Sequence, residues 1–406
     1  MDKNTTVHII GAGFSGLSLA WELAKKDISV QIYESERVGG LIASHRTTTH
    51  LRETAANGVL WNPRFAKLAD ELGVAFRPTQ KWAKKRFIFR DKKCRQWPLS
   101  TFETLKTFGY FMSQKFRVKK NNSLESWSLQ KLGPFFTDYV LDAAIRGIFS
   151  IPSKQLDVRS VFNSFKKIFP GRSQGTYAPT DGMGALIEAL QKKLEQKKIY
   201  IQKKTVTHLA ELKTTSTEDI FIIATSAWDA ALILNNSNIT LPWLAELNQI
   251  KSSALTTVVL VWPNDVKHLR GFGCLFPPKE GFASSGVIFN HYLFEERGPL
   301  PSETWILSSE GDQTNDELID LVLSDRKRLY PTQLAERPIE FHIQRWPKAL
   351  PIYDDAVYQL TQTYLKKTTN NRIYLTGNYL GKIGLAKIYD SNILLSEKIK
   401  KDYFHA

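Results

Sequence analysis

The 406-residue sequence is poor in cysteine, and its two cysteines, Cys94 and Cys274, do not form a CxxC pair. This content is typical of a reducing compartment and argues against a disulfide framework. The eight histidines show neither an HExxH motif nor a clustered ligand spacing, so no bound metal is predicted. No run of about 18 apolar residues is present, so no membrane-spanning helix is predicted. The first strand begins within "MDKNTTVHIIGAG", which leaves no room for a signal peptide, and we expect a cytoplasmic protein.

Acidic residues are fewer than basic ones. The sequence has 40 Asp and Glu against 55 Lys and Arg, which gives a net charge of +15. This excess indicates an anionic partner, such as nucleic acid, an anionic membrane surface or a polycarboxylate, or else only a solvated lysine-rich surface. No zinc finger, RNP motif or arginine-rich tail is present, so nucleic acid is not predicted as a partner. The length and the 42% hydrophobic content suit a globular protein of two or three domains.

The order of periodic segments predicts an α/β fold. The first forty residues read as strand, helix and strand, and "RIYLTGNYLGKIGLAKIYDSNILLSEKI" closes the chain as strand, glycine loop and helix. Between them, residues 101–170 have a helical pattern and residues 250–345 mainly a strand pattern. A βαβ opening whose counterpart returns at the C-terminus indicates a discontinuous domain with insertions.

A dinucleotide-binding motif lies in the opening βαβ unit. Gly11, Gly13 and Gly16, with Phe14 and Ser15 between them, form a GxGxxG that follows a strand and opens a helix. These glycines allow a tight turn, close approach to a pyrophosphate and close contact of helix and strand. Glu34, at the end of the next strand, can accept hydrogen bonds from ribose hydroxyls.

The loop after Glu34 predicts which dinucleotide is bound. The string "ESERVGG" contains Ser35, Arg37, Gly39 and Gly40 and resembles the extended fingerprint of FAD enzymes of the glutathione-reductase-like class. In that class the arginine and the glycine backbone lie along the ribose and phosphates, so FAD is the predicted cofactor. Further cofactor contacts are predicted in the "ETAANG" segment, after two internal strands and in the C-terminal glycine loop. These residues are Ala56, Asn57, Gly58, Val206, Thr225, Trp346, Gly377 and Gly384.

Several segments, in the same order along the chain, together resemble the protoporphyrinogen oxidase family of the monoamine-oxidase-like flavoproteins. They are "KKRFIFRDKKCRQWPLS", "YVLDAAIRGIFSIPSKQLDVRSVF", "RGFGCLFPPKEGFASSGVIFNHYLF", "RWPKALPIYDDAV" and the C-terminal glycine loop. The resemblance implies oxidation of a porphyrinogen, protoporphyrinogen IX or coproporphyrinogen III, by hydride transfer to FAD in heme biosynthesis. Dioxygen is the expected electron acceptor, and a homodimer is in keeping with the family.

The resemblance also implies a substrate site without catalytic acid–base residues, because the flavin performs the chemistry. Arg86 is the candidate anchor for a propionate, since a guanidinium can bind a carboxylate in a bidentate manner. An apolar slot for the macrocycle is expected between Phe272, Gly273, Leu275 and Ile288 on one side and Gly147 and Ser150 on the other.

Three positions depart from the family pattern. "ETAANG" stands where an acid followed by Gly-Pro is usual, Lys387 replaces an aspartate, and Asn392 replaces a helix glycine. The alternatives are therefore an amine or carotenoid oxidoreductase, a redox-neutral nucleotide-sugar mutase, or a flavoprotein kept only as a scaffold.

The resulting prediction is a Rossmann-like FAD-binding domain with two inserted units. The FAD-binding domain comprises residues 1–78, 172–240 and 346–406, and an α+β substrate domain comprises residues 241–345. Residues 79–171 form a substrate and helical unit, in which the basic, aromatic segment 101–120 suggests contact with an anionic membrane surface. The location expected from this contact is the inner face of the membrane.

Overall fold

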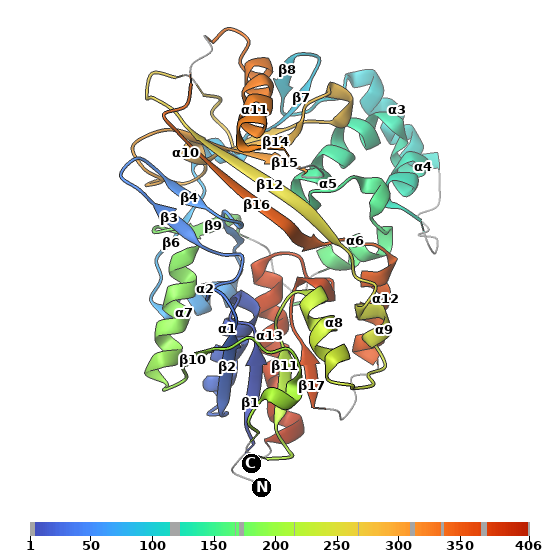
Figure 1. Ribbon diagram of the computed structural model, residues 1–406. Coiled ribbons are helices and arrows are strands. Elements are labelled where there is room, and N and C mark those ends of the chain that lie inside the picture. Colours follow the sequence, from blue (N-terminus) through green and yellow to red (C-terminus); the bar gives the residue numbers. More distant parts are fainter. Residues whose placement is uncertain are drawn as a thin grey trace.

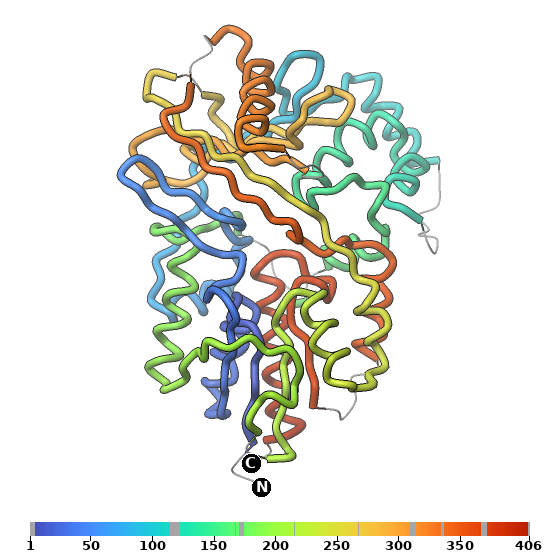
Figure 2. The backbone as a smooth tube through the Cα atoms, viewed as in Figure 1, coloured from blue at the N-terminus to red at the C-terminus, as the bar shows by residue number. Residues whose placement is uncertain are grey.

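The computed structural model describes residues 5–113, 122–166, 168–169, 174–214, 216–266, 268–308, 313–333, 337–366 and 372–404. One end of the molecule is built on a parallel sheet and the other on a larger, mainly antiparallel sheet (Figure 1). The tube in Figure 2 shows that the N-terminal and C-terminal segments lie together at the end with the parallel sheet. None of the described helices is both long and apolar enough to cross a bilayer.

The parallel sheet joins strands from three distant parts of the chain. Its spatial order is β10 (Ile201–Lys203), β2 (Val30–Glu34), β1 (Val7–Ile10), β11 (Ile220–Ile223) and β17 (Ile373–Leu375). All four residues of β1 are buried, as expected for a central strand with both faces covered. The sequence-based prediction of a discontinuous, Rossmann-like domain is consistent with this sheet.

Helices cover both faces of the parallel sheet. One apolar core contains residues of α1 (Phe14–Ala24), α2 (Pro63–Leu72), α7 (Gly184–Gln196) and α13 (Leu385–Tyr403). The core on the other face contains residues of α8 (Ala227–Asn236), α9 (Leu244–Leu247) and α12 (Asp355–Lys366). The chain therefore forms a three-layer unit, whose loops at the carboxyl ends of the strands are the usual location of a ligand.

The second sheet has seven strands. Their order is β16 (Glu340–Pro351), β12 (Ser252–Val261), β15 (Ser302–Leu307), β14 (Ser284–Phe289), β13 (Gly273–Leu275), β7 (Arg86–Arg90) and β8 (Lys93–Arg95). The predicted hairpin is thus present as β7–β8, at the edge of this sheet. Helices α10 (Asn290–Leu293) and α11 (Asn315–Leu329) belong to the same end of the molecule.

Most of the described residues between 101 and 165 are helical, in agreement with the helical pattern of residues 101–170. The helices are α3 (Thr101–Ser113), α4 (Leu124–Phe136), α5 (Asp142–Phe149) and α6 (Val158–Phe165), with a π-helical segment at Thr137–Leu141 between α4 and α5. Residues 114–121, which include the end of the predicted membrane segment, lie outside the described residues. The Tyr110 ring of α3 packs against Gly133 of α4, where a Cβ would come within 2.7 Å of that ring.

Two small sheets connect the ends of the molecule. One is the hairpin of β3 (Ser44–Arg46) and β4 (Leu51–Glu53). The other joins β5 (Val59–Leu60), β9 (Thr176–Pro179) and β6 (Phe76–Pro78). Short 3₁₀ turns lie at Lys81–Lys84, Ser153–Gln155, Leu209–Glu211, Pro278–Glu280 and Asn378–Leu380.

The predicted domain division remains a prediction, but two of its boundaries do not coincide with strand ends or sheet membership. The boundary between residues 345 and 346 falls inside β16, which pairs with β12 as far as Pro351. The β7–β8 hairpin, predicted to share a unit with the helices, belongs to the sheet of residues 252–351. In both cases the pairing partner is distant in sequence, so local pattern could not locate the boundary.

Candidate functional site

The glycine-rich loop lies where β1 ends and α1 begins. Gly11 has φ +104°, and a Cβ there would lie 2.9 Å from the carbonyl oxygen of Ala224. A Cβ on Gly16 would lie 2.0 Å from the carbonyl oxygen of Gly11, so only glycine allows this contact of helix and loop. Gly13, in contrast, faces open space, and as the N-cap of α1 it provides no side-chain hydrogen bond to the first turn. The free N–H groups and the open approach suit a pyrophosphate.

Glu34 and the loop that follows it close around the same glycines. The Glu34 carboxylate accepts hydrogen bonds from the backbone N–H of Ala12 at 2.7 Å and of Glu36 at 2.9 Å. The Gly39 N–H donates to the Ala12 carbonyl at 2.8 Å, and a Cβ on Gly40 would lie 3.4 Å from the Gly13 Cα. The glycine-rich loop of Gly11–Gly16 and the loop of Glu34–Gly40 therefore lie against each other. Together they form the candidate FAD-binding cradle.

Arg37 and Ser35 lie in the loop of that cradle. The Arg37 guanidinium donates to the carbonyls of Gly40 and Ile42, which fixes the turn that carries the glycine pair. Ser35 is exposed beside Glu34. Their predicted contacts with FAD remain predictions, whereas the role of Arg37 in shaping the loop is visible directly.

Three further predicted cofactor residues lie at the same edge of the parallel sheet. Thr225 follows β11, and its methyl group would be 3.2 Å from a Cβ on Gly11. Val206 follows β10 and is buried in the core that also contains Tyr33. Gly384, at φ +90°, precedes α13 without a side-chain cap and with open space at its Cβ position. A second free helix N-terminus therefore starts near this edge, after Gly377 and β17.

Asn392, the polar residue that replaces a helix glycine, connects α13 to the dinucleotide helix. Its side chain is fully buried, and its amide donates to the Ser15 carbonyl at 2.8 Å and to the Ser18 hydroxyl at 2.9 Å. Its oxygen accepts from the Thr376 hydroxyl at 2.5 Å. All these polar groups are satisfied, so the substitution strengthens the contact of the two helices.

Lys387, the second departure, connects the start of α13 to the end of α6. Its ammonium donates to the Ser164 carbonyl and lies 5.4 Å from the centre of the Phe165 ring. Burial, and then the charge of Lys382 in the glycine loop, lowers the pKa of Lys387.

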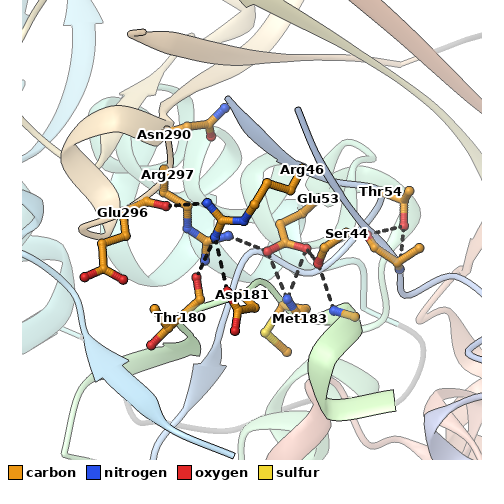
Figure 3. A network of polar contacts seen from close by, with 12 residues as sticks. Ser44, Arg46, Glu53, Thr54, Thr180, Asp181, Met183, Asn290, Glu296 and Arg297 are labelled. Carbon is orange, nitrogen blue, oxygen red and sulfur yellow. Dashed lines mark hydrogen bonds and ion pairs between the residues drawn. The ribbon is translucent and has the colours of Figure 1, made fainter. Parts of the chain in front are cut away.

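A polar network with a buried centre fixes the segment that contains "ETAANG" (Figure 3). Glu53 is 3% exposed and pairs with the Arg297 guanidinium at 2.5 Å. The Ser44 hydroxyl and the Met183 N–H also donate to Glu53, the latter at 3.0 Å. Arg46 donates to the carbonyls of Thr180 and Glu296 at 3.0 and 3.1 Å. The hairpin β3–β4 is therefore tied both to the start of α7 and to the loop after α10.

The predicted flavin neighbours Ala56, Asn57 and Gly58 follow directly. They are half-buried, and a Cβ on Gly58 would lie 3.0 Å from the Phe294 ring. The indole N–H of Trp346 donates to the Thr54 carbonyl at 3.2 Å and links β16 to this segment. The structure thus brings these four predicted residues together, and their contact with flavin stays a prediction.

The predicted substrate residues come from four elements that adjoin one another. Arg86 on β7, Gly273 on β13 and Ile288 on β14 lie directly beside one another across three strands. The exposed Arg86 guanidinium stacks 4.6 Å from the centre of the Phe272 ring. A cation therefore lies beside an apolar ring, and the contact of these residues with a substrate stays a prediction.

The expected position of Gly147 opposite Leu275 is wrong in one respect. A Cβ on Gly147 would lie 2.7 Å from Leu275 Cδ2, so these two residues are in contact and no slot separates them here. Ser150, at φ 61°, ends α5, and its carbonyl accepts from the Ser308 hydroxyl at 3.4 Å. The motifs located the helix and the strand, but they do not specify how closely a glycine lets the two approach.

A cavity of about 500 Å³ is lined by residues close in sequence to the predicted substrate residues and by the loop after α10, and sequence reasoning did not identify it. Its lining includes Trp82, Arg270, His291 and Arg297. The Arg270 guanidinium lies 5.0 Å from the centre of the Trp82 ring, and burial lowers the pKa of His291. One signal was available, because Arg270 directly precedes the quoted "GFGCL" strand. Arg297 carries no such local signal.

Residues 14–383 match the family described as flavin containing amine oxidoreductase. The sequence is 24% identical to protoporphyrinogen oxidase 2, chloroplastic/mitochondrial, of Arabidopsis thaliana, over 94% of this chain and 91% of that protein. It is 22% identical to coproporphyrinogen III oxidase of Staphylococcus aureus, over 97% and 98% of the two chains.

Two solved structures have a similar fold. A putative protoporphyrinogen oxidase of Exiguobacterium sp. 255-15 superimposes with a TM-score of 0.76 at 17% identity, over 98% of this chain and 99% of that chain. Reduced UDP-galactopyranose mutase superimposes with a TM-score of 0.78 at 14% identity, over 98% and 96%. At these identities the similarity establishes the fold alone.

Proposed function

Since this chain belongs to the flavin-containing amine oxidoreductase family and is an FAD-dependent oxidoreductase, we propose that it oxidises a porphyrinogen to the porphyrin in heme biosynthesis. The observation that carries the proposal is the alignment of Arg86, Gly273 and Ile288 across three strands, which places a cation at the edge of an apolar wall. Near-complete alignment with relatives named protoporphyrinogen oxidase and coproporphyrinogen III oxidase supports the same substrate class.

In this proposal the protein residues bind and orient the substrate. Arg86 holds a propionate, and its stacking on Phe272 restricts the guanidinium to the edge of the wall. Phe272, Gly273 and Ile288 contact the macrocycle and exclude water. FAD, when bound in the cradle of Gly13, Glu34 and Gly39, supplies the hydride acceptor, and dioxygen is the proposed final acceptor.

Between the two porphyrinogens, the cations around Trp82 would favour the more carboxylated coproporphyrinogen III, although Glu295 and Glu296 line the same cavity. The Trp82 ring has three cations around it, with Lys81, Lys85 and Arg270 at 5.1, 5.7 and 5.0 Å from its centre. Additional propionates would find charged hydrogen-bond donors there, whereas the vinyl groups of protoporphyrinogen IX would not.

An anaerobic half-reaction tests this function. Each porphyrinogen is mixed with the oxidised, FAD-loaded protein without oxygen, and the flavin absorbance is followed by stopped flow. We expect both to bleach the flavin and coproporphyrinogen III to do so at the lower concentration. If neither bleaches it, the substrate class is wrong. Isomerisation of a nucleotide sugar by the reduced protein, without net electron loss, would instead establish the mutase alternative.

We also propose that α3 binds an anionic membrane surface at the cytoplasmic face. Phe102, Leu105, Phe108 and Met112, at helical spacing, are 62 to 67% exposed. Lys106 lies on the same helix, 4.4 Å from the centre of the Phe102 ring. Large apolar side chains with a neighbouring cation suit the interface of a negatively charged bilayer.

A further inference from the structure

A compact group of potential metal ligands lies outside the site described above. His50 lies in the turn between β3 and β4, and Glu340 and His342 lie on β16. Because alternate residues of a strand share a face, Glu340 and His342 point to the same side. One ligand atom from each of the three residues lies within 4.8 Å of the others. Sequence reasoning missed the group because His50 is almost 300 residues away from Glu340 and His342.

The side chains in this group are held in place. The Thr49 hydroxyl donates to Oε1 of Glu340 at 2.8 Å, which leaves Oε2 facing the histidines. Oε2 lies 3.8 Å from His50 Nδ1 and 3.6 Å from His342 Nε2. The two imidazole rings are 5.1 Å apart, measured between their centres. Hydrogen bonds from neighbouring residues, such as the one from Thr49 to Glu340, orient metal-ligating side chains in proteins.

The polar atoms of the two histidines are not fully satisfied. The His50 side chain is completely buried. Within the described parts of the chain, Nε2 of His342, the atom that faces Glu340, is buried without a hydrogen-bond partner. Nδ1 of His50, which faces the same carboxylate, lies 3.1 and 3.0 Å from the hydroxyls of Thr47 and Thr49, and it would exchange these contacts for the ion. A buried imidazole nitrogen in this state costs free energy that a bound ion would remove.

From this geometry we propose that His50, Glu340 and His342 bind a divalent transition-metal ion of the zinc class. Two imidazoles and one carboxylate are typical ligands of Zn²⁺, whereas Ca²⁺ and Mg²⁺ prefer oxygen ligands throughout. Ligands of a tetrahedral zinc ion lie about 3.3 Å apart. Oε2 of Glu340 lies 3.6 and 3.8 Å from the two histidine nitrogens, and the whole group lies within 4.8 Å, so binding of the ion would draw the side chains closer together. Glu340 and His342 are about one-third exposed, which gives the ion access and leaves a position for water.

The ion would join the hairpin turn to the second sheet. The Thr49 carbonyl accepts from the Leu300 N–H at 3.0 Å, and the Leu51 N–H donates to the Arg297 carbonyl at 2.7 Å. The turn therefore already contacts the loop that contains Arg297, the partner of Glu53. A bound ion would add a further connection between this turn and β16 and stabilise the hairpin.

Equilibrium dialysis of the untagged, FAD-loaded protein against Zn²⁺ tests the proposal, after removal of metals with a chelator. We expect about one tightly bound ion per chain and a higher melting temperature with Zn²⁺ than without. His342→Ala and Glu340→Gln, both at partly exposed positions, should each weaken binding about tenfold or more without changing the FAD content. His208→Ala is the matched control, because His208 lies 2.8 Å from Glu211 on another surface.

Unchanged Zn²⁺ affinity in both His342→Ala and Glu340→Gln would overturn the proposal, as would an equal loss in His208→Ala. Co²⁺ provides an independent readout, since its visible absorption reports the ligand geometry. An octahedral spectrum identical in the parent and in His342→Ala would contradict a site built on this histidine.

Discussion

The buried carboxylate of Glu53 pairs with the guanidinium of Arg297 at 2.5 Å, across 244 residues of sequence. The pair connects the small hairpin next to the predicted flavin segment with the loop that lines the cavity. The structure of the candidate site therefore depends on a charge pair that has no local sequence signal.

Removing one partner of this pair is expected to destabilise the protein. Arg297→Met leaves Glu53 buried without its cation, which should cost about 3–5 kcal/mol and lower the melting temperature. The double variant Glu53→Gln with Arg297→Met should recover part of the loss. Thermal unfolding measures both effects. Lys398→Ala, in an exposed ion pair, is the control and should cost less than about 1 kcal/mol. A double variant no better than the single one would show that the pair is not coupled.

Arg86→Ala is expected to weaken porphyrinogen binding about 10- to 100-fold, because the propionate loses a charged donor. The FAD content should not change, since Arg86 lies on the sheet of the other end of the molecule. Titration of the anaerobic bleaching reaction measures the affinity. Arg77→Ala, at an exposed arginine on β6, is the matched control. Loss of FAD from Arg86→Ala would make this arginine structural.

The two loop glycines should respond differently to alanine. Gly16→Ala places a Cβ 2.0 Å from a backbone oxygen, so the loop must move and stability should fall by about 2–4 kcal/mol. Gly13→Ala meets no protein atom, so the fold should persist while FAD affinity drops tenfold or more. Circular dichroism and flavin content after gel filtration separate the two effects. Full FAD retention by Gly13→Ala would contradict the predicted approach of the pyrophosphate.

Acid is expected to loosen α3 through Glu103. Hydrogen bonds from Arg90, opposed by burial, lower the pKa of Glu103 to about 2, from an ordinary value of 4.5. In the pH range between these values the unfolded state binds the proton more readily, so stability is lost as pH falls from about 5 to 2. The ionised Glu103 contributes about 1–3 kcal/mol to the unfolding free energy at pH 7. Solvent near the pair with Arg90 screens the interaction and lowers this contribution. Parent and Glu103→Gln should therefore differ in unfolding free energy at pH 7 and converge near pH 2.

Membrane contact should depend on the apolar face of α3. Phe108→Glu is expected to reduce binding to vesicles containing phosphatidylserine severalfold, because it replaces an exposed apolar group by a negative charge. Leu365→Glu makes the same kind of change on α12, at a residue 68% exposed, and should not alter binding. Vesicle sedimentation provides the measurement. Equal loss in both variants would indicate an effect of net charge alone.

The cofactor region could be predicted from sequence because its signals are local. The glycines, Glu34 and the "RVGG" turn lie within about thirty residues, and the FAD cofactor and the family resemblance are confirmed by the match over residues 14–383. Helix α1 and its two neighbouring strands follow the same local pattern. The predicted roles of single residues remain predictions.

The parts that escaped prediction depend on contacts distant in sequence. Arg297 and the group of His50, Glu340 and His342 come together only when the hairpin meets the second sheet. The contact of Gly147 with Leu275 depends on how closely a helix approaches a strand, a distance that motif spacing does not encode. The pairing of charged residues and histidines that are distant in sequence can therefore be found only from the three-dimensional structure.

The paired strands β12 and β16 reach from one end of the molecule toward the other (Figure 1), with Ser252 opposite Pro351 where they approach the parallel sheet. The chain thus passes between the two ends twice along one hydrogen-bonded ribbon, whose register is irregular only between Ser253 and Leu255. A bulge bends the strand that carries it, so residues 253–255 are where the direction of this ribbon changes. The relative orientation of the two sheets, and with it the distance from Arg86 to the glycine-rich loop, therefore depends in part on the backbone at this one irregularity.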